Sequence, residues 1–269
     1  MVLQETLGFL GFGNMGKAIA AGLLETGVIA PKHLAAYDLY EEKRNEAEAL
    51  GATTFEAAHA FAAACDMIVL ATKPQDMDAA IEGIKSSLPK HALVISIAAG
   101  ISISFIQQRL GADRRVVRVM PNTPALVNAG ATGMAISATC TESDIAKARA
   151  IFEAIGIVEV VPEEQIDVVT ALSGSGPAYF FYMVECLVRA AMANGLPEAQ
   201  ATRLAAQTLA GSGLLLKHSG EAAATLRARV TSKGGTTEAA LKRFEADGFE
   251  SIIAAGVNAA AARARELGM

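Results

Sequence analysis

From residue 6 to about residue 161, short apolar runs alternate with segments whose apolar residues fall on one helical face. Segments such as 41–50 and 144–154 carry charged residues on one face and Ala, Leu or Ile on the other. Strands that alternate with helices are typical of βαβ units and a mainly parallel sheet. The pattern predicts the following strands, with residues 132–137 as a candidate for one more: Thr6–Leu10, Leu34–Asp38, Met67–Thr72, Leu93–Ala98, Val116–Met120 and Gly156–Val161.

The pattern changes after Pro162. No later segment alternates at period two, and Gly, Ser or Pro separate stretches with helical periodicity. We therefore expect an α/β fold in which a sheet domain, residues 1–162, is followed by an all-α domain, residues 163–269. A chain of 269 residues also has the length of about two domains.

The longest helices of the second part are expected at Pro177–Ala193, Pro197–Lys217 and Phe249–Leu267. The first two have proline in the first turn, where its missing N–H costs little. In the third, residues recur at helical spacing and form one apolar stripe: Ile252, Ile253, Gly256, Val257 and Ala260. Such a stripe suits intrachain core and subunit contact equally well, and the sequence leaves both open.

Composition narrows the class of protein. Hydrophobic residues make up 52% of the chain and charged residues 19%, which indicates a globular fold. A net charge of −5 provides no field that attracts nucleic acid or an anionic membrane, so we expect neither as a partner. No apolar run reaches the roughly 18 residues of a membrane span, and no basic region marks a signal peptide. These features predict a cytoplasmic protein.

The cysteines are Cys65, Cys140 and Cys186, which are odd in number, far apart and set among apolar neighbours. Buried free thiols fit this arrangement better than disulfides or a metal site. We expect a reducing compartment and no bound metal.

A glycine-rich turn follows the first predicted strand, with the sequence Gly11-Phe12-Gly13-Asn14-Met15-Gly16. A helical pattern continues from it, so the turn has the strand–turn–helix context of a dinucleotide site. The first glycine permits the tight turn, the second lets backbone N–H groups approach a pyrophosphate, and the third lets the helix sit close to the strand. This turn predicts a Rossmann-type domain that binds NADH or NADPH.

Asp38, at the end of the second predicted strand, bears on the choice between the two cofactors. A carboxylate there accepts hydrogen bonds from the ribose 2′-OH and repels a 2′-phosphate. However, Lys43 and Arg44 follow closely and are long enough to reach a phosphate, and Asp38 would also serve as a cap of the next helix. The sequence leaves the preference open.

Other strand ends should line the same cleft, because open α/β sheets bind ligands at the carboxyl ends of their strands. These loops are Ala71-Thr72-Lys73-Pro74 and Ala98-Ala99-Gly100. Asn122 lies between two prolines at a further strand end, where its amide suits either loop rigidity or contact with the nicotinamide region.

A polar loop, residues 230–237, interrupts the helical part and reads Val-Thr-Ser-Lys-Gly-Gly-Thr-Thr. Exposed backbone N–H groups, hydroxyls and a helix N-terminus in one place are suited to hold a carboxylate. A Gly C-cap followed by a Thr N-cap between two helices explains the same residues equally well.

The whole chain resembles pyrroline-5-carboxylate reductase, the enzyme family that makes L-proline. The last two of the matching motifs belong to the helical domain of that family and not to dinucleotide folds in general. The motifs are residues 11–16, Lys73-Pro74, Ser96-Ile97-Ala98-Ala99-Gly100, residues 120–124, Ser173-Gly174-Ser175-Gly176-Pro177-Ala178-Tyr179, and residues 232–237.

The resemblance implies that the carboxylate of 1-pyrroline-5-carboxylate is held by the Ser232 hydroxyl and by N–H groups of Ser232, Gly234 and Gly235, with Thr236 nearby. Thr237 would hydrogen-bond the ring nitrogen as the catalytic residue. The family also implies a substrate-binding and dimerisation role for residues 163–269, a homodimer or larger homo-oligomer, and the last step of proline biosynthesis.

The chain departs from the family pattern at three places. Lys233 stands where proline is common, Thr72 where an aliphatic residue is usual, and residues 221–224 replace a His-Pro-Gly-like turn. These differences bear on loop rigidity and affinity more than on the reaction.

Hydride transfer to a protonated imine needs mainly positioning and exclusion of water, which agrees with the lack of a His, Cys or carboxylate cluster in the sequence. Two other hypotheses are a β-hydroxyacid dehydrogenase-like oxidoreductase and a non-catalytic dinucleotide sensor. The first needs a lysine early in the second domain, which residues 178–187 do not offer. The second does not explain the loop at 232–237.

Overall fold

The computed structural model describes residues 1–268. The chain forms two compact units. The first comprises residues 1–175 and the chain from residue 260, and the second comprises residues 176–259. An α/β part followed by helices is the predicted fold class, which is confirmed.

Within the described residues, eight strands form one sheet in the order β3-β2-β1-β4-β5-β6-β7-β8. All neighbours are parallel except β6 and β7, so the predicted mainly parallel sheet is confirmed. The sequence pattern missed β3, because two residues are too few to show a period. The strands are β1 (Leu7–Leu10), β2 (Leu34–Tyr37), β3 (Thr53–Thr54), β4 (Met67–Leu70), β5 (Leu93–Ser96), β6 (Val116–Met120), β7 (Gly130–Ile136) and β8 (Gly156–Val160).

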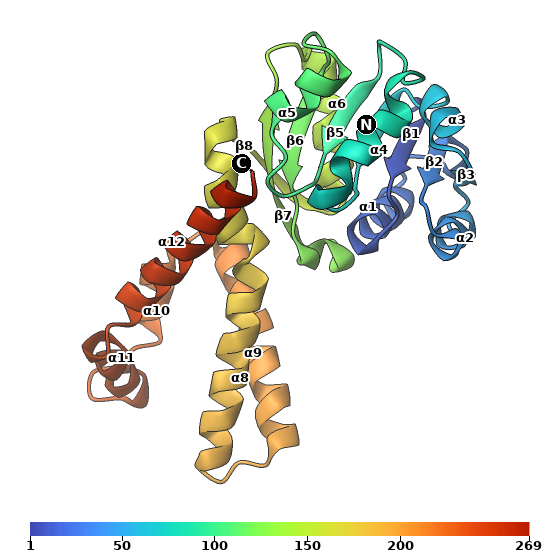
Figure 1. Ribbon diagram of the computed structural model, residues 1–269. Coiled ribbons are helices and arrows are strands. Elements are labelled where there is room, and N and C mark those ends of the chain that lie inside the picture. The colour runs from blue at the N-terminus through green and yellow to red at the C-terminus, as the bar shows by residue number, and fades with distance from the viewer. Residues whose placement is uncertain (269) are drawn as a thin grey trace. The chain divides into compact units, whose positions relative to one another are not determined.

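Helices cover both faces of this sheet (Figure 1). They are α1 (Asn14–Glu25), α2 (Glu41–Ala49), α3 (Ala58–Ala63), α4 (Met77–Lys85), α5 (Ile103–Leu110), α6 (Glu142–Glu153) and α7 (Ile166–Val169). Short 3-10 turns occur at Pro31–His33, Pro74–Asp76, Thr123–Val127 and Glu163–Gln165, and a π-helical turn at Thr170–Gly174.

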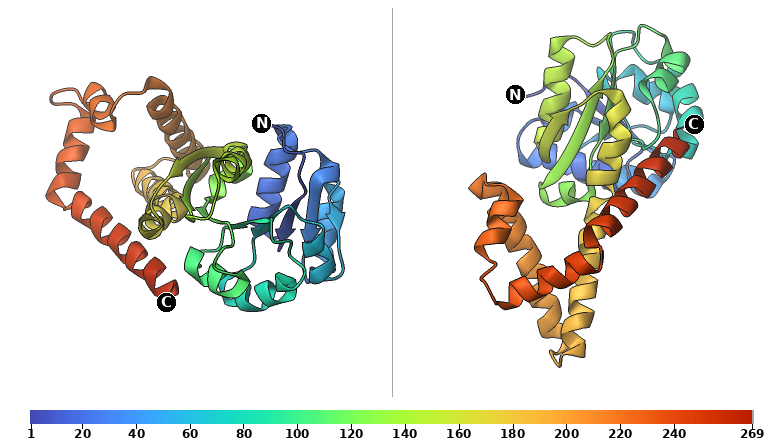
Figure 2. Two further views of the ribbon diagram at one scale, coloured as in Figure 1. Left: turned by 90° about the horizontal axis from the view of Figure 1, so that it is seen from above. Right: turned by 90° about the vertical axis from the view of Figure 1, so that its left-hand side faces the viewer.

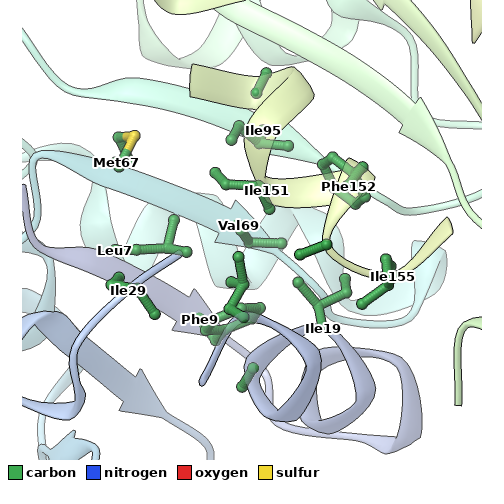
Figure 3. Close-up of a cluster of buried hydrophobic side chains, with 14 of the residues drawn as sticks. Leu7, Phe9, Ile19, Ile29, Met67, Val69, Ile95, Ile151, Phe152 and Ile155 are labelled. Atoms are coloured by element: carbon green, nitrogen blue, oxygen red, sulfur yellow. The ribbon is translucent and has the colours of Figure 1, made fainter. Parts of the chain in front are cut away.

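The hydrophobic core of the first unit lies in two layers, one on each face of the sheet. Helices α1, α2 and α6 cover one face, and α3, α4 and α5 cover the other. In the first layer, Phe9 and Val69 of the strands pack with Ile19 of α1 and Phe152 of α6, all fully buried (Figure 3). Each such side chain stabilises the fold by about 1.5–3 kcal/mol. These layers hold the strand ends in fixed positions.

The second unit is built from α8 (Gly176–Ala193), α9 (Glu198–Ser219), α10 (Ala223–Arg229), α11 (Thr236–Ala246) and the first part of α12 (Phe249–Leu267). Helices α8 and α9 pack side by side, as Figures 1 and 2 show. Pro177 lies in the first turn of α8 as predicted, but Pro197 has extended backbone and precedes α9 as its N-cap. No helix in the described part of the chain is both long and apolar enough to cross a bilayer.

The helices of the second unit bury few of their large apolar side chains. On α12, Ile252 and Ile253 of the predicted stripe are exposed, so that part of the stripe does not form intrachain core. The exposed apolar residues of the unit are Phe180, Phe181, Tyr182, Met183, Leu187, Met192, Leu204, Leu214, Leu215, Leu216, Val230, Phe244, Phe249, Ile252 and Ile253. Large exposed apolar areas of this kind mark protein interfaces.

The cysteines are free, but the prediction that all are buried is wrong in part. Cys65 is buried and Cys140 half-buried, whereas Cys186 on α8 is exposed. Its apolar sequence neighbours belong to the exposed face of α8, so a local apolar context did not indicate burial here.

Candidate functional site

The glycine turn joins β1 to α1, which begins at Asn14 with Gly13 as its N-cap. Gly11 has φ of +91°, a conformation that L side chains rarely adopt, and a Cβ there would lie 3.0 Å from the carbonyl oxygen of Ala71. A Cβ on Gly16 would lie 3.1 Å from the oxygen of Gly11. At Gly13 a Cβ would meet nothing within 4 Å. The outer glycines therefore allow close packing, and the middle one faces open space.

Hydrogen bonds from the neighbouring strands fix this turn. The Gly11 N–H donates to the carbonyl oxygen of Tyr37 at 2.8 Å, and the Phe12 N–H donates to Oδ2 of Asp38 at 2.8 Å. The Phe12 ring is fully buried and meets Phe9 edge-on, with 5.9 Å between ring centroids. Phe12 thus contributes its backbone to the site while its ring anchors the turn in the core.

A cavity of about 540 Å³ opens beside the turn. It lies where β1 separates β2 from β4, the point at which the strand order reverses and open α/β sheets bind ligands. It is lined by the predicted residues Gly11, Gly13, Asp38, Ala71, Thr72 and Lys73, together with Leu10, Tyr37, Leu39, Tyr40, Lys43, Ala58, Asp76, Ala79, Ala80 and Gly83.

These features fit a dinucleotide. The volume falls within the usual range of ligand pockets, roughly 300–1,000 Å³. The N-terminus of α1 presents unpaired N–H groups and a partial positive charge, which suit a pyrophosphate beside the open side of Gly13.

Sequence reasoning missed the α4 wall of this cavity. Ala79, Ala80 and Gly83 lie at i, i+1 and i+4, so one helical face carries only small residues. That spacing was present in the sequence and is the signal that would have indicated a helix approached closely by a ligand.

Several predicted cofactor residues do not line the cavity: Phe12, Asn14, Met15, Gly16, Pro74, Ala98, Ala99, Gly100 and Asn122. Gly100 follows β5 with φ of +78°, and a Cβ on it would lie 2.7 Å from the carbonyl oxygen of Leu267 at the end of α12. The glycine thus permits the close approach of two backbones.

Asn122 is 8% exposed, and its amide ties the β6 end to two other segments. Its Nδ2 donates to the carbonyl oxygen of Ser173 at 2.9 Å, and its Oδ1 accepts from the N–H of Ala131 at 2.8 Å. Of the two roles that the sequence left open, the structure uses the amide for loop rigidity. Two motifs far apart in sequence, residues 120–124 and 173–179, therefore meet.

The polar loop of the second unit follows α10 and ends where α11 begins at Thr236. Gly234 has φ of +74°, and the Gly235 N–H donates to the carbonyl oxygen of Ser232 at 3.0 Å. A Cβ on Gly235 would collide with the Ser232 hydroxyl. The two glycines are therefore required by the tight path of the loop.

The helix cap at α11 is Gly235, so the alternative in which a threonine caps this helix is wrong. Thr236 and Thr237 are instead the first two helical residues. Within the described residues no partner is recorded for the Thr237 hydroxyl, whose residue is half-buried. This hydroxyl is available to a ligand at the helix N-terminus.

A carboxylate already sits on this loop. The Gly234 N–H donates to Oε2 of Glu238 at 2.7 Å, and Oε1 of Glu238 lies 3.2 Å from Nζ of Lys242. One backbone N–H of the loop thus faces a carboxylate of the same chain. Sequence reasoning did not identify Glu238, although Glu at the third helical position is a known signal for bonding back to N-terminal N–H groups.

A second cavity, of about 240 Å³, lies at the amino ends of β4 and β5. Its polar side chains are paired: Lys147 with Glu5 at 2.6 Å, His91 with Asp66 at 3.2 Å, and Arg115 with Asp144 at 2.8 Å. These pairs lie at the edge of the sheet opposite the carboxyl ends of the parallel strands. We therefore assign them to stability and not to ligand binding. Among residues 1–268, no group of three or more His, Cys, Asp or Glu side chains is placed to hold a metal ion.

Comparison with known proteins identifies relatives of the whole chain. The family model described as pyrroline-5-carboxylate reductase dimerisation matches residues 163–267, and that described as NADP oxidoreductase coenzyme F420-dependent matches residues 6–100. The pyrroline-5-carboxylate reductase of Escherichia coli is 40% identical, over 93% of this chain and 94% of its own length.

Solved structures agree. A pyrroline-5-carboxylate reductase from Coxiella burnetii has a TM-score of 0.93 and 36% identity, covering 99% of this chain and 100% of that one. The Plasmodium falciparum pyrroline carboxylate reductase with NADP bound has a TM-score of 0.89 and 30% identity, and both chains are covered completely.

Proposed function

The chain belongs to the pyrroline-5-carboxylate reductase family, and we propose that it reduces 1-pyrroline-5-carboxylate to L-proline with NADH or NADPH, the last step of proline biosynthesis. The observation that carries this proposal is the polar loop at residues 232–237, where the start of α11 offers N–H groups to an anion and one of them faces the carboxylate of Glu238. No feature favours a β-hydroxyacid dehydrogenase or a dinucleotide sensor.

The cofactor half of the site is assigned to the first unit. The turn at residues 11–16 would hold the pyrophosphate, and Asp38 would contact the adenosine ribose. The loop at 71–74 would lie on the nicotinamide side, with the loop at 98–100 beyond it, and Asn122 would act there by holding its own loop in place. When bound, the reduced nicotinamide supplies a hydride to the imine carbon.

The substrate half is assigned to the polar loop. The Ser232 hydroxyl and N–H groups of Ser232, Gly234 and Gly235 would hold the carboxylate, with Thr236 at the rim. The partial positive charge at the N-terminus of α11 favours an anion at this place. Lys233 is exposed on the same loop and adds a positive charge. For the substrate to bind, Glu238 has to release the N–H of Gly234.

Thr237 is the proposed catalytic residue. Its hydroxyl would accept from, or donate to, the ring nitrogen and so orient the imine. A protonated imine is already electrophilic, and its reduction needs position more than acid–base groups. The Thr237 hydroxyl suits this role because no backbone cap uses it.

We assign residues 1–162 to cofactor binding and 163–269 to substrate binding and dimerisation. The match of the dimerisation model to residues 163–267 supports this division. The exposed apolar residues of α8, α9 and α12 support a homodimer formed through the helices, or a larger homo-oligomer that contains it. The composition supports a cytoplasmic location and gives no support to nucleic acid or a membrane as partner.

A steady-state assay tests the proposal. Purified protein with the cyclic imine and NADH or NADPH should consume the reduced cofactor and produce L-proline. A 3-oxo acid in place of the imine should give no turnover. Turnover with the 3-oxo acid alone would support the dehydrogenase hypothesis, and cofactor binding without turnover of either compound would support the sensor.

A further inference from the structure

Asp38 marks the point in the cofactor cavity where NADH and NADPH differ. It follows β2 directly, lines the cavity and is half-buried. In an open α/β domain the residue at the end of the second strand faces the ribose 2′ position. A carboxylate at this place accepts a hydrogen bond from the 2′-hydroxyl of NADH and repels the 2′-phosphate of NADPH.

The carboxylate of Asp38 is held in one position by the backbone. Its Oδ2 accepts from the N–H of Phe12 at 2.8 Å, and its Oδ1 accepts from the N–H of Tyr40 at 3.0 Å. Each carboxylate oxygen has a second lone pair, so both can still accept from a ribose hydroxyl. The carboxylate cannot move aside for a phosphate without breaking the bond that fixes the glycine turn.

The two basic residues that follow Asp38 are each held by other groups of the protein. The Lys43 ammonium pairs with Glu46, which also pairs with Lys17 at 3.0 Å. Nη1 of Arg44 donates to the carbonyl oxygens of Asp38 and Leu39, at 2.8 and 3.3 Å. Arg44 does not line the cavity at all.

The remaining charges of the cavity offer no excess of positive charge. Its charged lining residues are Asp38, Lys43, Lys73 and Asp76, two carboxylates and two ammonium groups. Behind Lys43, the charge of Glu46 is matched by Lys17, so this pair adds no net charge. A 2′-phosphate, with a charge near −2 at neutral pH, would meet the Asp38 carboxylate without an excess of positive charge to offset the repulsion.

We propose that Asp38 makes this enzyme prefer NADH over NADPH. This inference rests on one part of the proposed function, the use of a nicotinamide dinucleotide. It concerns binding of the adenosine half of that cofactor and not the reaction. The proposed preference differs from the cofactor in the structure of the Plasmodium falciparum relative, which has NADP bound. The preference for NADH follows from the Asp38 carboxylate and from the hydrogen bonds and ion pairs that hold Lys43 and Arg44.

The test compares both cofactors on the full-length protein, by dissociation constants from nicotinamide fluorescence and by kcat/KM with saturating imine. Wild type should favour NADH by about tenfold or more, the scale of a hydrogen bond to a charged group. Asp38→Asn keeps an oxygen that can accept from Phe12 and removes the charge. It should lose most of the preference through weaker NADH binding and stronger NADPH binding.

Glu41→Gln is the matched control. It removes the same charge three residues away, at an exposed position outside the cavity, and should leave the ratio unchanged. Tighter binding of NADPH by wild type, or an unchanged ratio in Asp38→Asn, would overturn the proposal. Because binding is measured without substrate, a wild type that prefers NADH but does not turn over the imine would contradict the proposed function and leave the role of Asp38 intact.

Discussion

The carboxylate of Glu238 accepts a hydrogen bond from the backbone N–H of Gly234, with 2.7 Å between nitrogen and oxygen. This contact occupies a donor that the proposed function gives to the substrate carboxylate. In the proposed binding mode, Glu238 therefore competes with the substrate carboxylate for this N–H.

Replacing Glu238 by Ala should lower the KM for the imine about three- to tenfold, because one net hydrogen bond no longer has to be exchanged on binding. Steady-state kinetics with varied imine at saturating cofactor measure this KM. Glu245→Ala, which removes an exposed carboxylate from the same helix, should leave KM unchanged. A higher KM in Glu238→Ala would mean instead that Glu238 orders the loop for binding.

Thr237→Ala should reduce kcat/KM for the imine by about tenfold or more, because the ring nitrogen loses its hydrogen-bond partner. The dissociation constant for the reduced cofactor, measured by fluorescence without substrate, should stay within about twofold, since the change touches the loop alone. Thr237→Ser keeps the hydroxyl and should retain most of the activity. An equal loss of cofactor binding in Thr237→Ala would show the loop assignment to be wrong.

Gly13 and Gly16 should respond differently to the same substitution. Gly13→Val meets open space, so the urea midpoint of unfolding should hardly change while cofactor affinity falls by about tenfold or more. Gly16→Val places its side chain against the Gly11 carbonyl and should destabilise the protein by about 1–3 kcal/mol. Unchanged cofactor binding in a folded Gly13→Val protein would contradict the pyrophosphate assignment.

Asp144 should make part of the stability depend on pH. Its side chain is buried, accepts from the N–H and hydroxyl of Thr141 at 2.8 and 2.7 Å, and pairs with Arg115. Burial raises the pKa of this carboxyl, but the hydrogen bonds from Thr141 and the charge of Arg115 outweigh it, so the pKa lies below its ordinary value.

A lowered folded-state pKa contributes stability that is full above the unfolded-state pKa, about 4, and is lost as the pH falls through the folded value. Asp144→Ala should therefore cost about 2 kcal/mol of unfolding free energy at pH 7, and the gap to wild type should narrow below pH 4. Urea unfolding of wild type and variant at pH 7 and below pH 4 measures this difference in unfolding free energy. Asp113→Ala, at an exposed position, is the control. A gap that stays constant with pH would exclude the ionised carboxylate as its cause.

The sequence predicted those parts of the molecule that depend on local pattern. The parallel strands, the glycine turn and the start of a helix near Thr236 follow from periodicity and from the conformations that glycine permits. The two-residue strand β3 has no period to detect, and its pairing depends on β2.

Partners far apart in sequence were not predictable in the same way. That the Asn122 amide is used by Ser173 and Ala131 depends on where the chain returns, which no local pattern contains. The pairing of Lys17 with Glu46, 29 residues away in the sequence, likewise depends on the fold and not on a local pattern. Exposure of Cys186 depended on what covers α8, which the residues beside it do not specify.

The scarcity of buried apolar side chains in α8, α9 and α12 has a consequence for synthesis on the ribosome. Residues 1–175 contain the core of the sheet and can collapse while the helices are still being translated. The helices leave the ribosome last, so their apolar faces are exposed after the sheet core is already buried. Exposed apolar faces on a newly made chain favour aggregation, so chaperone supply and translation rate should affect the yield of folded enzyme.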